Sequence, residues 1–96
     1  MRVSGDIADP MGLDIVNLFI TFEKEFDLEI PNSEAAYLTT PGKVIDWVFL
    51  QLETLGRPVP REHIAQAVKR ITLEHSSIPE RIYREEARFV NDFCMD

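Results

Sequence analysis

The sequence predicts an all-α fold in which four helices pack as a bundle. Apolar residues recur at helical spacing in three segments, at residues 13–26, 44–55 and 61–74. Prolines and glycines fall between these segments, where such residues end helices. The chain has 96 residues, of which 45% are hydrophobic, and this is enough for one domain with a core of moderate size.

The first segment, residues 13–26, has a wide apolar stripe on one side and charged residues on the other. The pattern is too long and too irregular in alternation for a strand. Asp14 lies in the first turn, where the helix dipole favours an anion. Pro31 pushes Ile30 into an extended conformation, so the helix should end a few residues earlier. The apolar positions are Leu13, Val16, Leu18, Phe19, Ile20, Phe22 and Phe26.

A short helix and a second long helix are expected next. Asn32 or Ser33 can cap a short helix over residues 34–38. Thr40 suits the N-cap of the long helix, and Pro41 suits its first position, where an N–H has no partner within the helix. The inward face of this long helix is expected to carry Val44, Ile45, Val48, Phe49, Leu52 and Leu55.

The second half of the chain is predicted to be a linker, a helix and a tail. Residues 56–60 contain a glycine and two prolines, which end the preceding helix and make a stiff linker. Residues 61–74 are amphipathic, and the Ser-Ser-Ile-Pro at 76–79 ends that helix. Residues 80–86 have room for one more turn. The positions expected to face inward are Ile64, Ala65, Val68, Ile71 and Leu73.

Six short motifs occur in one order, without a gap, in the first half of the chain: Leu13-Asp14, Glu25-Phe26, Ile30-Pro31, Thr39-Thr40, Gly42 and Ile45-Asp46. In this order they resemble the acyl carrier proteins. The pattern of that family is a serine, Leu-Asp, a helix ending in Glu-Glu-Phe, Ile-Pro, a short helix, Thr-Thr-x-Gly and a last helix. The resemblance implies an acyl-carrier-protein-like four-helix bundle, and in the family the serine carries a 4′-phosphopantetheine arm.

The residue at the position of that serine is Gly12. A glycine has no hydroxyl with which to form a phosphodiester, so we expect no phosphopantetheine at this degenerate cofactor position. Ser4 is the only serine before the first helix, and it lacks the Leu-Asp that follows the family's serine. A working acyl carrier protein with its arm attached at another site, or with a serine from a partner chain, is the alternative.

The end of the chain carries a second resemblance, at residues 68–96. These residues resemble the first helix of the family and the loop after it, with Asp96 at the aspartate that precedes the serine. The resemblance therefore implies a circular permutation, with the usual first helix placed at the C-terminus. On this interpretation residues 1–96 are one domain with a flexible leader (1–11), a carrier-like core (12–55), a linker (56–60) and a helix with its loop (61–96). The alternative is a homodimer formed by exchange of the C-terminal segment.

The resemblance also implies protein partners. In carrier proteins the helix after the serine is strongly acidic and docks on basic patches of acyl-metabolism enzymes. The sequence thus predicts a non-catalytic module that binds a protein partner in fatty-acid or polyketide-type metabolism. A helical domain that shares only its packing with the family is a third possibility. The candidate partner-binding residues are Asp14, Asn17, Glu23, Lys24, Glu25 and Glu34.

The aromatic residues are expected to serve the core. Carrier bundles shelter acyl chains, so a cavity between Phe19, Val48 and Ile71 could hold a fatty acid, but small bundles usually pack their cores fully. The residues expected in or near the core are Phe19, Phe22, Phe26, Trp47 and Phe49.

Composition argues against several other functions. A net charge of −7 makes nucleic acid and anionic membranes poor partners. No apolar run approaches the roughly 18 residues of a membrane span, and the single cysteine, Cys94, is typical of a reducing cytoplasm. His63 and His75 are not spaced as ligands of one metal ion. Because no catalytic constellation occurs, we expect neither a metal site nor an enzyme.

Overall fold

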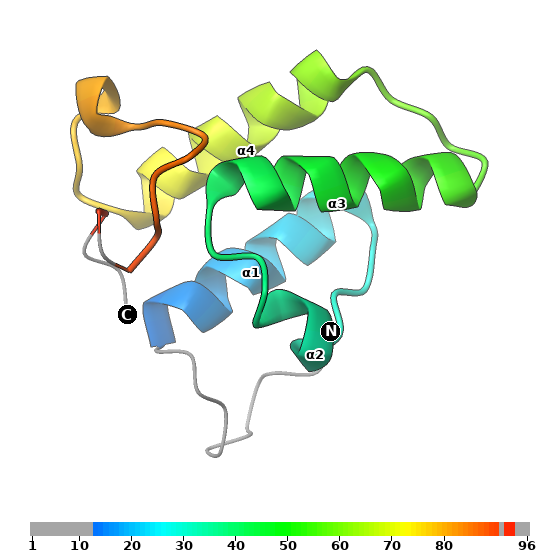
Figure 1. The fold of residues 1–96 in the computed structure, drawn as a ribbon, viewed down its shortest axis with the longest axis horizontal. Helices are drawn as coiled ribbons and strands as arrows, with labels where there is room; N and C mark the ends of the chain where they lie inside the picture. The colour runs from blue at the N-terminus through cyan, green and yellow to red at the C-terminus, as the bar shows by residue number, and fades with distance from the viewer. Residues whose placement is uncertain (1–12, 91, 94–96) are drawn as a thin grey trace.

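The computed structural model describes residues 13–90, 92 and 93, and this part of the chain is helical with no strand (Figure 1). The predicted all-α class is therefore confirmed. Gly12, the leader before it, Cys94 and Asp96 lie outside the described residues. The elements are α1 (Leu13–Phe26), α2 (Asn32–Ala35), α3 (Pro41–Thr54), α4 (Arg61–His75) and a 3₁₀ turn, η1 (Glu80–Ile82).

The two predicted ends of α3 are confirmed. Thr40 has an extended backbone, and its side chain accepts a hydrogen bond of 3.2 Å from the Lys43 N–H. Pro41 occupies the first turn, as its fixed φ favours. At the other end Gly56 has φ +76°, in the left-handed region that glycine adopts without a steric penalty.

The predicted bounds of the short helix, residues 34–38, were wrong, since the helix begins two residues earlier and ends three residues earlier. α2 begins at Asn32 instead of residue 34, and neither Asn32 nor Ser33 caps it. The extended Pro31 is the N-cap, and its carbonyl accepts hydrogen bonds from the amides of Glu34 and Ala35. No side chain caps the helix, so the capping residues that the sequence offers do not mark where it begins.

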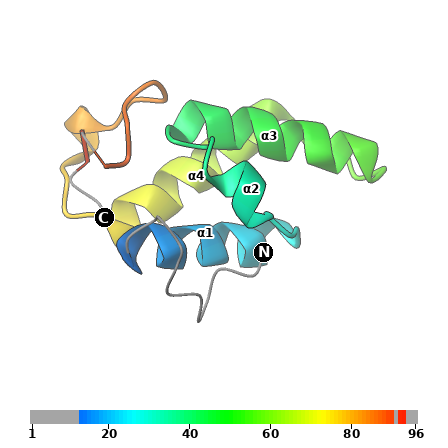
Figure 2. The ribbon, with the colours of Figure 1, turned by 60° about the horizontal axis from the view of Figure 1, so that its bottom comes forward.

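The helix α4 is the element against which both α1 and α3 pack (Figure 2). Its residues Ile64, Val68 and Ile71 are buried as predicted, Ala65 packs at the edge of the core, and Thr72 is buried as well. The predicted aromatic residues are all in or near this core. Phe19 and Phe22 are fully buried, and the partly buried ones are Phe26, Trp47 and Phe49.

The segment after α4 folds back over α1 and the start of α3 (Figure 1). The extra turn predicted for residues 80–86 is shorter than expected and is limited to η1. Beyond it Ala87, Phe89 and Phe93 are buried, and the Phe89 ring lies edge-on to Phe19 with centroids 6.1 Å apart. The last described residues therefore complete the core of the same chain.

Candidate functional site

The outward face of α1 is the surface that sequence analysis predicts for partner binding. Asp14, Asn17 and Lys24 are exposed on it, and Thr21 lies between them. Their spacing of three and four residues places them on one side of the helix. The structure therefore brings together three of the six candidate residues.

Glu25 is directed towards α4. Its carboxylate forms an ion pair of 3.2 Å with Arg70. One turn earlier, Thr21 Oγ1 lies 3.0 Å from Nε2 of His75, which is also on α4. Glu25 and Thr21 thus join α1 to α4 through polar contacts, although Thr21 lies among the residues of the outward face.

Glu23 has a structural contact that the sequence did not reveal. Its Oε2 accepts a hydrogen bond of 2.8 Å from the N–H of the buried residue Ile30. The Glu23 carbonyl also accepts from the Leu28 N–H at 3.1 Å, across Asp27, whose φ is 53°. Glu23 therefore holds the turn after α1.

Glu34 belongs to a different element and is exposed in the first turn of α2. Cations also lie close to the carboxyl end of α1, where Lys24 is exposed and Arg57 donates to the Asp27 carbonyl at 3.0 Å. The described part of this surface consequently has mixed charge, unlike the strongly acidic helix that the family resemblance implies.

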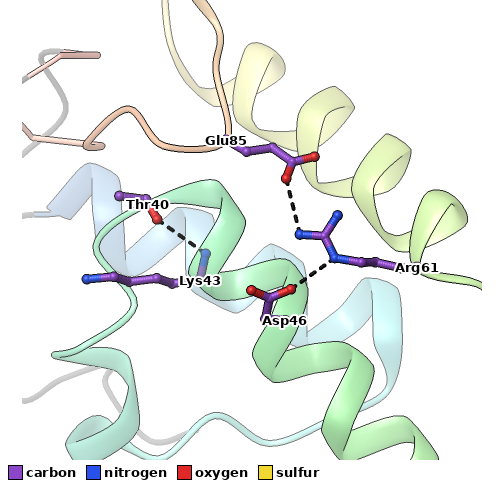
Figure 3. Close-up of polar contacts among 5 residues, drawn as sticks. All are labelled: Thr40, Lys43, Asp46, Arg61 and Glu85. Carbon is purple, nitrogen blue, oxygen red and sulfur yellow. Dashed lines mark hydrogen bonds and ion pairs between the residues drawn. The ribbon is translucent and has the colours of Figure 1, made fainter.

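A polar cluster that sequence analysis missed joins three elements (Figure 3). Arg61, at the start of α4, pairs with Asp46 of α3 at 2.9 Å and with Glu85 of the tail at 3.1 Å. The hydrogen bonds that Arg61 donates to Asp46, and then to Glu85, raise the pKa of Arg61. The two partners of Arg61 lie 15 and 24 residues away along the chain, so no local pattern in the sequence reveals the cluster.

Tyr83 is the second perturbed group of the tail. Its ring stacks on Phe93 with centroids 5.8 Å apart, and Lys69 Nζ lies 5.8 Å from the ring centre. Burial, and then the charge of Glu85, raises the pKa of Tyr83 well above its usual value. The phenol is therefore neutral at physiological pH.

The other candidate sites remain predictions. Among the described residues no three His, Cys, Asp or Glu side chains gather as metal ligands. Phe19, Val48 and Ile71, which could have lined a fatty-acid cavity, are each at most 1% exposed and belong to the core. In the same part of the chain, no helix has the length and apolarity needed to cross a bilayer.

The described residues thus define a small helical bundle with an exposed polar helix face. Comparison with curated proteins shows acyl carrier proteins among its relatives. The chain is 35% identical to the acyl carrier protein of Amoebophilus asiaticus over 51 residues, 50% of this chain and 64% of the relative. It is 33% identical to that of Clostridium acetobutylicum over 51 residues (50% and 66%) and 40% identical to that of Cyanidioschyzon merolae over 45 residues (47% and 50%).

These similarities confirm that the chain is acyl-carrier-protein-like. The aligned part spans between half and two thirds of the length of these curated relatives. No family model matches the chain, and no solved structure matches it.

Proposed function

We propose that this chain is an acyl-carrier-protein-like, non-catalytic module that binds a protein partner in fatty-acid or polyketide-type metabolism and carries no phosphopantetheine. The observation that carries the proposal is the similarity to acyl carrier proteins together with Gly12 at the family's serine position. We place the protein in the cytoplasm, in keeping with its single cysteine.

The chemistry of Gly12 decides against the prosthetic group. When bound, phosphopantetheine supplies a thiol that holds an acyl chain as a thioester. Its attachment requires a side-chain hydroxyl, and Gly12 has no side chain. Gly12 therefore does not fit the group. The function that remains for the bundle is binding of a partner through its surface.

We also propose that the helices of the carrier fold are present in permuted order. The support is that α4 packs on both α1 and α3, where the first helix of a carrier bundle would have to pack. The tail then returns to the start of α3, because the Gly42 N–H donates to the Glu85 carbonyl at 2.7 Å. Side-by-side helices bury the same faces whatever their order along the chain.

The proposed partner surface is the exposed face of α1 with α2. Asp14 and Glu34 offer carboxylates to a basic patch, and Asn17 and Lys24 add further polar groups. The carboxylates of Glu23 and Glu25 are bound within the chain. Glu23 accepts a hydrogen bond from the Ile30 N–H, and Glu25 pairs with Arg70. Because few carboxylates remain free, we expect weaker electrostatic steering than for an acidic carrier helix.

The test is incubation with coenzyme A and a phosphopantetheinyl transferase, followed by intact-mass measurement. One of the curated relatives in the same reaction is the positive control. We expect the relative to gain one arm and this protein to gain none. A gain of one arm on the unchanged protein would reject the proposal and establish the alternative, an acyl carrier protein with its arm at another site.

The Gly12→Ser variant asks a separate question, which is whether the surroundings of residue 12 still suit the transferase. Modification of this variant at residue 12, in an otherwise unchanged chain, would show that the hydroxyl is the only missing part. If neither the unchanged protein nor Gly12→Ser is modified, the surface that docks on the transferase also differs from that of the carrier proteins, as its mixed charge indicates.

A further inference from the structure

The tail forms a separate layer on the bundle, which we call the strap and define as residues 79–90, 92 and 93. Its own regular structure is limited to the 3₁₀ turn η1. Two backbone hydrogen bonds join it to the turn before α3 and to the first turn of α3. Gly42 N–H donates to the Glu85 carbonyl at 2.7 Å, and Phe89 N–H donates to the Thr39 carbonyl at 3.1 Å.

The contact at Gly42 depends on the absence of a side chain. Gly42 is the second residue of α3, so its N–H has no acceptor within the helix. The Glu85 carbonyl supplies that acceptor. A Cβ added at Gly42 would lie 2.9 Å from the Glu85 oxygen, which is a backbone atom and cannot rotate away. Any larger residue at 42 must therefore displace the strap locally.

The remaining contacts of the strap are apolar at Phe89 and Phe93 and ionic at Glu80 and Glu85, of which Glu80 pairs with Lys69 at 2.8 Å. Phe89 and Phe93 are each 2% exposed, and Phe89 covers Phe19 of α1. Glu85 pairs with Arg61, but both side chains are 42% exposed. Exposed pairs of this kind contribute little to stability and are screened by salt.

We propose that the strap opens and closes on the bundle as one unit, with the Gly42–Glu85 contact as its catch, and that opening uncovers Phe19 on α1. Segments with few backbone hydrogen bonds to their surroundings open at lower free energy than the helices that support them. Closing the strap buries Phe89 and Phe93 together, which makes the motion cooperative. The inference does not depend on the proposed function.

Amide hydrogen exchange of the whole protein tests this inference. Gly42 of α3 donates to the strap and Phe89 of the strap donates to Thr39, so each side of the contact has one amide that reports its opening. If the strap opens as a unit, both amides exchange with the same opening constant, and both are at least about tenfold less protected than that of Val48 within α3. In Gly42→Ala we expect at least about tenfold lower protection of Phe89, although alanine favours the helix. Glu53→Ala, at an exposed position near the other end of α3, is the control and should leave Phe89 unchanged.

Arg61→Gln provides a second, milder variant if Gly42→Ala does not fold. It should lower the protection of Gly42 and Phe89 together, by up to about fivefold. Arg57→Gln, at the far end of α3, should change neither. Unequal opening constants for the two amides, exchange of both only with global unfolding, or unchanged Phe89 protection in Gly42→Ala would each overturn the proposal.

Discussion

At the scale of single residues, Glu23 shows how a surface carboxylate is diverted to a structural contact. Its position before Lys24 and Glu25 suggests a solvated charged face, yet its carboxylate accepts from the amide of Ile30. That partner follows the turn after the helix, so helical spacing cannot reveal it. Glu25 is similar, because its partner Arg70 belongs to another helix.

The contact of Glu23 predicts a loss of stability in Glu23→Ala. The N–H of Ile30, a residue only 1% exposed, would lose its acceptor. We expect the free energy of unfolding to fall by about 1–3 kcal/mol, measured by urea denaturation. Glu34→Ala, which alters an exposed carboxylate, is the control and should change the free energy by less than about 0.5 kcal/mol. Equal effects of the two substitutions would contradict this role of Glu23.

Tyr83 predicts a dependence of stability on alkaline pH. Its pKa is higher in the folded protein than in the unfolded chain, mainly through burial. The folded state therefore keeps the phenol protonated after the unfolded chain has begun to lose that proton. The contribution of Tyr83 to stability is complete below about pH 10 and is lost as the pH rises towards the folded pKa.

Tyr83→Phe tests this expectation by denaturation at several pH values. The variant should lose less stability than the unchanged protein above about pH 10. At neutral pH it should cost little, because the buried Tyr83 hydroxyl has no hydrogen-bond partner among the described residues. Tyr37→Phe, at a side chain that is 76% exposed, is the control. Identical pH profiles for the unchanged protein and Tyr83→Phe would refute the assignment.

At the scale of elements, the three long helices were predictable and the tail was not. Local signals fix the long helices, since apolar spacing gives the faces and Thr40, Pro41 and Gly56 give the ends of α3. The burial of Phe89 and Phe93 instead depends on Phe19 and the Thr39–Gly42 turn, which are distant in sequence. The Arg61 cluster was missed for the same reason.

The tail predicts that Phe89 is as important to stability as a residue of the helical core. Phe89→Ala would leave a cavity beside Phe19 and Phe93, and we expect a loss of about 3–5 kcal/mol. Val90→Ala, at a side chain that is 56% exposed, should cost less than about 0.5 kcal/mol. Thermal or chemical unfolding measures both. A loss below about 1 kcal/mol for Phe89→Ala would contradict the burial of the Phe89 ring against Phe19 and Phe93.

At the scale of the whole molecule, packing of α4 and the strap within one chain predicts a monomer. Exchange of the C-terminal segment with a neighbouring chain would make the same contacts between two molecules. Light scattering across a range of concentrations distinguishes the two forms. We expect a constant mass near 11.1 kDa, the mass of one chain, and a dimer that persists on dilution would favour exchange.

The order of the helices gives a second test at this scale. If the fold is a permuted carrier bundle, joining the end of the chain to residue 12 and opening it within residues 56–60 should preserve the fold. Circular dichroism and the amide protection of α3 measure this outcome. The permutation would be contradicted if the rejoined chain lost its helix content under conditions in which the unchanged protein keeps its own.

The central claim is that this acyl-carrier-protein-like bundle does not hold the prosthetic group of its relatives. The most direct test is the intact mass of the protein purified from the cells that make it. We predict the mass of the unmodified chain, with no phosphopantetheine at any residue. A form heavier by one phosphopantetheine arm would contradict the claim.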